Sequence, residues 1–226
     1  MQWPNIKTID DFARYSLLLF SFISVAFSTY QIIKKKHKRF MFLIPIFFLL
    51  IVIQLLINEY VCYLGDITGG KTNATNFSLA IYLIAEDALL LLLIAISSKS
   101  LFLKKYSKLT IPIFILLNSL CWLYIPKWTT YLSVVSTTEA LLMIFACFYY
   151  YYEILNAPPT LNLINEPSFW IVSGVFILFL CITPINLAIE STLVVNYLKS
   201  LDSIAYILIT LMFLKATSCK AQIKTS

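Results

Sequence analysis

Three acidic residues stand inside long apolar stretches of this sequence, where charged side chains are rare. Glu86 and Asp87 interrupt one stretch, and Glu139 interrupts another. An ionisable group inside a membrane span is costly, usually faces the interior of the helix bundle, and is a default candidate for function. No Lys or Arg is spaced to neutralise these acids within their spans. The residue types therefore indicate a site for a proton, a cation or an amine.

Acids on three stretches share one depth. The distances to the polar ends of their stretches are 13 residues from Glu86 to Lys99, 14 from Glu139 to Glu153, and 13 from Asp202 to Lys215. At about 1.5 Å of rise per residue, each carboxylate lies about 20 Å from the same membrane surface. This depth defines one layer in the outer half of a hydrocarbon core about 30 Å thick.

Amides on neighbouring stretches extend the layer. Gln54 and Asn118 lie about 22 Å and about 15 Å from that surface by the same rise. We predict a ligand-binding set that comprises Glu86, Asp87, Glu139, Asn118, Asp202 and Gln54. The alternative is that these groups only hydrogen-bond one helix to the next, at about 0.6–2 kcal/mol per contact.

The spacing of polar residues predicts the walls of the pocket, because positions three or four apart share a helix face. Two such faces occur, one with Ser78, Tyr82 and Glu86 and one with Ser133, Ser136 and Glu139. If they converge, they form an outward-facing cleft with both glutamates at its floor. Two close carboxylates cannot both ionise at low cost, so one is expected to keep a proton or to hold a cation.

The elements that position these residues are membrane helices. The chain has 226 residues, is 60% hydrophobic and has a mean hydropathy of +0.86, too apolar for a soluble domain of this size. A span needs about 20 mostly apolar residues. Seven stretches meet or nearly meet this length: residues 12–33, 40–63, 77–98, 109–124, 130–152, 168–189 and 196–214. We expect an all-α polytopic membrane protein whose seven transmembrane helices form one bundle and a single domain over residues 1–226.

The distribution of basic residues predicts the orientation. With the run from Lys34 to Arg39 placed in the cytoplasm, twelve of the 17 Lys and Arg residues lie on that side. The positive-inside rule then places the N-terminus outside and the C-terminus in the cytoplasm. Trp122 and Trp128 would mark the outer interface, and the run from Tyr149 to Tyr152 the inner one.

The sequence lacks the residues that several kinds of enzyme chemistry require. The single histidine, His37, lies in a basic run, so multi-histidine zinc chemistry is not expected. Phosphate-loop, dinucleotide-binding and nucleophile-elbow motifs are missing. The five cysteines are scattered and mostly lie in or beside apolar stretches, where they act as small hydrophobes. We expect no cofactor, no metal and no nucleic-acid partner, and a hydrolase that uses paired acids is the weakest interpretation.

The chain resembles a group of uncharacterised seven-helix membrane proteins of Bacteroidetes-type bacteria. The motifs that carry the resemblance are Ile84-Ala85-Glu86, Thr138-Glu139-Ala140-Leu141-Leu142, the aromatic run from Phe148 to Glu153, and Pro167-Ser168-Phe169-Trp170-Ile171-Val172. Such proteins resemble the membrane halves of sensor histidine kinases. The resemblance implies a multi-pass protein of the bacterial inner membrane and no established activity.

Two functions remain open. One is a sensor or receptor-like module that binds a small, cationic ligand from outside. Its loop from Glu153 to Pro167, which has no Lys or Arg, would contact a cytoplasmic signalling protein. The alternative is that the neighbouring segments fix the topology and the loop has no partner. The other is a small transporter coupled to protons or cations through Glu86 and Glu139. A loose repeat of acid followed by Ala-Leu-Leu at these two positions favours the transporter weakly.

Overall fold

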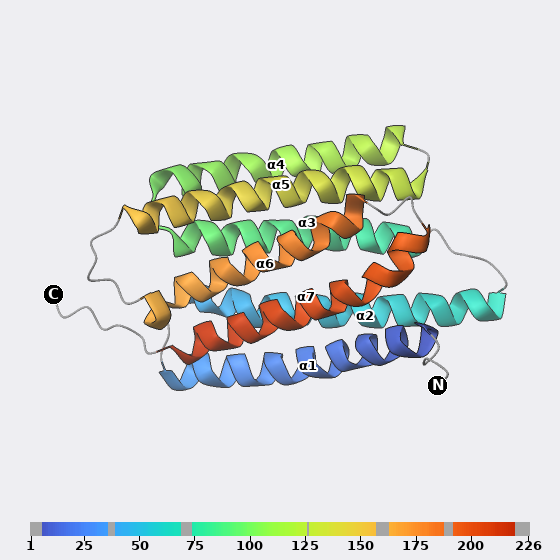
Figure 1. Cartoon of the computed structure of the whole chain (residues 1–226), viewed down its shortest axis with the longest axis horizontal. Helices are drawn as coiled ribbons and strands as arrows, with labels where there is room; N and C mark the ends of the chain where they lie inside the picture. The colour runs from blue at the N-terminus through green and yellow to red at the C-terminus, as the bar shows by residue number, and fades with distance from the viewer. Residues whose placement is uncertain are drawn as a thin grey trace.

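Seven α-helices form the structure, which is a computed structural model that describes residues 6–35, 39–68, 74–125, 127–156, 163–187 and 192–219. The helices are α1 (Ile6–Lys35), α2 (Leu43–Thr68), α3 (Ala74–Ser97), α4 (Leu101–Tyr124), α5 (Trp128–Leu155), α6 (Pro167–Leu187) and α7 (Thr192–Ser218). Two short 3-10 helices, Arg39–Phe42 and Leu163–Asn165, precede α2 and α6. Figure 1 shows the seven helices side by side, with consecutive helices running in opposite directions.

Six of these helices are long and apolar enough to cross a membrane, among the residues that the structure describes. They are α1 to α6, and α7 contributes a shorter apolar segment, Ser203–Ser218. Large apolar side chains such as Leu19, Leu116 and Leu141 are more than half exposed on the outside of the bundle, where lipid would cover them. The all-α fold and a multi-pass membrane protein follow, and the seventh crossing remains a prediction.

The start of α4 differs from the sequence prediction by eight residues. The segment from Lys99 to Lys108 was expected to be a short link, but α4 begins at Leu101. The side chain of Ser100 caps the helix, because its oxygen accepts a hydrogen bond from the backbone N–H of Phe102 at 3.0 Å. The lysines of the first turns stay exposed while Leu103 and Ser107 are buried, so a basic, amphipathic stretch joins the span.

The bundle has two chemically distinct ends. Lys34, Lys99 and Lys215 lie near the ends of α1, α3 and α7, which share one end of the bundle (Figure 1), called here the lysine end. At the opposite end, the tryptophan end, the rings of Trp122 on α4 and Trp128 on α5 lie 5.7 Å apart. The beginning of α1 and the end of α7 are at opposite ends of the bundle, as an odd number of antiparallel helices requires.

The aromatic run near the end of α5 is distributed around the helix. Tyr150 is 5% exposed, the hydroxyl of Tyr151 donates to that of Ser173 on α6 at 2.9 Å, and Tyr152 is 63% exposed. Successive helical residues point about 100° apart, so consecutive tyrosines cannot share one face. Only part of the expected interfacial band therefore faces outward.

α6 and α7 pack closely at Gly174. A Cβ atom at this position would meet Ile209 Cγ1 and Met212 Cβ at 3.2 Å each. Small residues allow such close approach of membrane helices, and the packing depends on the absence of a side chain.

We expect Gly174→Val to destabilise the protein by about 1–3 kcal/mol, because the added methyl groups overpack this contact. Gly174→Ala should have a smaller effect in the same direction. Thermal unfolding in detergent, monitored by tryptophan fluorescence, ranks the stabilities of the wild type and the two variants. Leu180→Phe adds bulk at an exposed position of the same helix and is the control. Equal stability of wild type and Gly174→Val would contradict this account of the α6–α7 contact.

Candidate functional site

Three carboxylates are buried together in the bundle. Glu86 and Asp87 on α3 are 2% and 1% exposed, and Glu139 on α5 is 3% exposed. The carboxylate of Glu139 is close enough to those of Asp87 and Glu86 for like-charge repulsion. We call these three residues the carboxylate triad. The equal depth expected from the sequence thus coincides with proximity, while the binding role of the triad remains a prediction.

Adjacent positions on α3 direct the two acids to different neighbours, because successive helical residues diverge by about 100°. Glu86 meets α7, where the hydroxyl of Tyr206 contacts both carboxylate oxygens at 3.0 and 3.1 Å. The hydroxyl of Tyr82 donates to that of Tyr206 at 3.4 Å, a long contact. Asp87 instead interacts electrostatically with Tyr106 on α4. The hydrogen bond from Tyr206 to Glu86 therefore joins α3 to α7.

Asp87 is the unsatisfied member of the triad. Both of its carboxylate oxygens are buried without a hydrogen-bond partner. Every lysine whose side chain the structure describes is exposed, so no described lysine is buried beside the triad. A buried carboxylate without a partner is costly, so its presence requires an explanation.

A metal ion does not match the spacing of these side chains. Among the described residues, no group of three or more His, Cys, Asp or Glu is arranged to hold one. Metal–oxygen distances of about 2.0–2.6 Å require closely gathered ligands. Protons and organic cations place weaker demands on the geometry.

Of the other predicted ligand residues, Gln54 and Asn118 are described, and their hydrogen-bond partners lie outside the triad. The amide of Gln54 donates to Asn58 on its own helix at 3.1 Å, and no described contact joins it to the triad. The side-chain oxygen of Asn118 accepts a hydrogen bond from the hydroxyl of Tyr131. Asp202 lies on α7, but its side chain is outside the described part of the structure.

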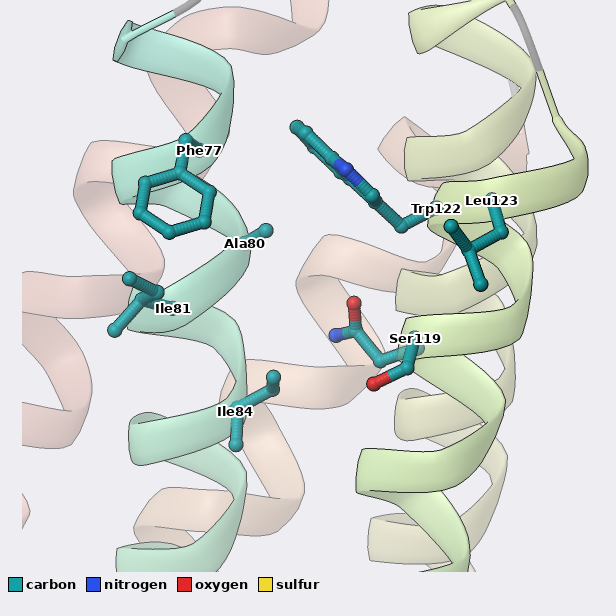
Figure 2. Close-up of a pocket in the computed structure, with 8 residues that line it drawn as sticks. Phe77, Ala80, Ile81, Ile84, Ser119, Trp122 and Leu123 are labelled. Carbon is teal, nitrogen blue, oxygen red and sulfur yellow. The ribbon is translucent and has the colours of Figure 1, made fainter.

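The described pocket lies between α3 and α4, toward the tryptophan end. Its volume is about 280 Å³, and it is lined by Phe77, Ala80, Ile81, Ile84, Asn118, Ser119, Trp122 and Leu123. Figure 2 shows Phe77, Ala80, Ile81 and Ile84 on one helix facing Ser119, Trp122 and Leu123 on the other. Its walls are mainly apolar and differ from the polar faces expected from the sequence. Ser133, one of those polar residues, donates to the carbonyl of Asn186 on α6 at 3.0 Å.

Sequence reasoning missed Tyr206, the hydrogen-bond partner of Glu86. Tyr206 follows Asp202 by four residues, so the two share one face of α7. That spacing was the available signal, but a tyrosine in an apolar helix usually serves packing and does not stand out.

Comparison of the chain with protein-family models, with curated proteins and with solved structures gives no match. The resemblance to seven-helix proteins of Bacteroidetes-type bacteria therefore remains a prediction. The arguments that follow depend on the geometry of the described residues.

We expect Asp87→Leu to raise the thermal stability of the protein, because leucine has the same number of side-chain heavy atoms and removes two unpartnered oxygens. A gain of about 1 kcal/mol corresponds to about 2–4 °C in melting temperature for a chain of this length. Glu86→Met is the matched control, since it removes a bonded carboxylate and should lower stability. A loss of stability in Asp87→Leu as large as in the control would show that Asp87 has a structural partner.

Proposed function

We propose that this chain is an integral membrane sensor or receptor-like module whose carboxylate triad takes up a proton or a small organic cation. The observation that carries the proposal is the pair of buried, unpartnered oxygens of Asp87 beside two further buried carboxylates. Binding one positive charge would offset both the repulsion within the triad and the cost of burying Asp87.

The hydrogen bond between Tyr206 and Glu86 could transmit ligand binding to the arrangement of α3 and α7. Its carboxylate holds the hydroxyl of Tyr206 and thereby links α3 to α7. A cation that draws the carboxylate away would weaken this link. A ligand shifts a conformational equilibrium only through contacts that differ between the two states, and the hydrogen bond from Tyr206 is such a contact.

The proposed orientation places the lysine end in the cytoplasm and the tryptophan end outside, in a bacterial inner membrane. In this orientation, the loop from Glu153 to Pro167 is cytoplasmic and available to a signalling protein. Residues 157–162 of the loop lie outside the described part of the structure. Glu153 itself accepts a hydrogen bond from the hydroxyl of Ser98, so α5 is joined to the end of α3 beside the loop.

A proton- or cation-coupled transporter is the second candidate. It is favoured by buried polar side chains on α4 between the triad and the lysine end. Thr110 and Ser107 are 5% and 4% exposed, and they lie one turn apart on the face of α4 that is buried in the bundle. Ser98, which is also buried, bonds to Glu153 nearer the lysine end. A proton that leaves the triad toward the cytoplasm would find polar groups at intervals along this path.

The orientation predicts which reagents reach two exposed lysines. In a cysteine-free background, Lys127→Cys should react with a membrane-impermeant maleimide added outside intact cells. Lys99→Cys should react only after the cytoplasmic membrane is opened. Both side chains are exposed, so a lack of reaction cannot be attributed to burial in the bundle. The reverse pattern would invert the topology.

We expect Glu86→Gln combined with Glu139→Gln to abolish binding while the fold is kept, because glutamine retains most hydrogen bonds and removes the charge. Infrared difference spectroscopy on the reconstituted protein detects a protonated carboxyl group that loses its proton when methylammonium is added. Wild type and the control Glu166→Gln should show this change, and the double variant should not. A change of equal size in the double variant would show that Glu86 and Glu139 are not needed for binding.

The same proteoliposomes distinguish the two candidate functions. Uptake of methylammonium or acidification of the lumen that depends on the wild-type protein supports the transporter. Binding without either flux supports the sensor.

A further inference from the structure

The groove between α3 and α4 combines an apolar surface with one unused hydrogen-bond donor. Asn118 lines the groove and is 2% exposed. Its amide nitrogen is buried and has no hydrogen-bond partner. Its amide oxygen is already engaged, since it accepts the hydroxyl of Tyr131. An occupant of the groove that satisfies the remaining group must therefore bring an acceptor.

Tyr131 fixes the orientation of this amide. Tyr131 is 1% exposed, and its ring stacks on that of Trp128 at 4.8 Å and meets the edge of Trp122 at 5.5 Å. The two indole rings hold the phenol ring of Tyr131, and its hydroxyl therefore leaves the Asn118 amide little freedom to turn. The amide nitrogen is therefore a preorganised donor in a site from which bulk water is excluded.

The rest of the groove fits a hydrocarbon chain. Phe77, Ile81 and Leu123 line it and are 58%, 52% and 75% exposed, so the groove opens on the flank of the bundle, where lipid lies. The rings of Phe77 and Trp122, from opposite walls, are 6.3 Å apart. A volume of about 280 Å³ is close to the lower end of small-molecule sites, about 300–1,000 Å³, and accommodates part of a chain.

The depth of Asn118 favours an acyl lipid. Asn118 precedes Trp122 by four residues and so lies about 6 Å deeper along α4. Tryptophans gather at the level of the lipid headgroups, and the acyl chains begin just below that level. The acceptor that a diacyl lipid carries there is the carbonyl oxygen of an ester.

We propose that the groove is a binding site for an ester-linked acyl lipid, whose chain lies between α3 and α4 and whose ester carbonyl accepts a hydrogen bond from the Asn118 amide. The site is separate from the carboxylate triad and does not depend on the function proposed for it.

The test compares two lipids that differ in one group. Phosphatidylglycerol with brominated acyl chains, which quench nearby tryptophans, is titrated into the full-length protein in detergent. Its diether analogue carries the same chains but has no ester carbonyl. The contribution of Trp122 is isolated by comparison with Trp122→Phe. We expect the ester lipid to bind about fivefold more tightly than the diether lipid, which is the effect of one hydrogen bond in a dry site.

Two variants assign the difference to Asn118. Asn118→Leu removes the donor and should bind both lipids equally, whereas Asn58→Leu, an amide on α2, should keep the fivefold preference. Ala80→Leu fills the groove and should reduce quenching by both lipids. Equal affinity of the wild type for the two lipids, or a preference that survives in Asn118→Leu, would overturn the proposal. The comparison of lipids on the wild type stands even if a variant fails to fold.

Discussion

Burial of the carboxylate triad, with no lysine buried beside it among the side chains that the structure describes, constrains the bundle. Three acids that repel one another must be kept out of lipid, because a carboxylate in hydrocarbon is far more costly than one inside a protein. α3 carries two of them and contacts α2, α4, α5 and α6. It is also the most enclosed of the six apolar spans, with 56% of its span buried against 22% for α4. The helix that carries two of the acids is thus also the span best shielded from lipid.

Partners for the triad come from helices far apart in the sequence. Tyr206 reaches Glu86 across 120 residues, and Glu139 approaches from α5. The carboxylate of Glu86 accepts the hydrogen bond from Tyr206, while both oxygens of Asp87 have no partner. Because the interior has a low dielectric, the unbonded carboxylate is the costly member of this cluster, and a positive charge bound there would offset that cost.

The sequence predicted six helices that are long and apolar enough to span a membrane, because hydropathy depends only on local order. It predicted that Glu86 and Glu139 share a depth, and the structure brings them within electrostatic range. The bond from Gln54 to Asn58 within α2 was missed, although a spacing of four residues on one helix was the available signal. The apolar groove was missed because its walls are ordinary membrane residues, and only the unsatisfied amide of Asn118 distinguishes it. The start of α4 was misplaced because lysines that extend to the surface resemble a loop.

The groove and Asp87 of the triad lie along one face of α3. Ala80, Ile84 and Asp87 are spaced three or four apart on α3, so Asp87 is one turn beyond the last groove residue of that helix. On α4, Phe114 lies one turn from Asn118 and one turn from Thr110, and it is 2% exposed. Its ring packs in an apolar cluster with Ala80, Tyr131 and Val135. A single apolar layer thus separates a surface that faces lipid from a buried acid, and a displacement of α4 that moves Phe114 would alter both sites.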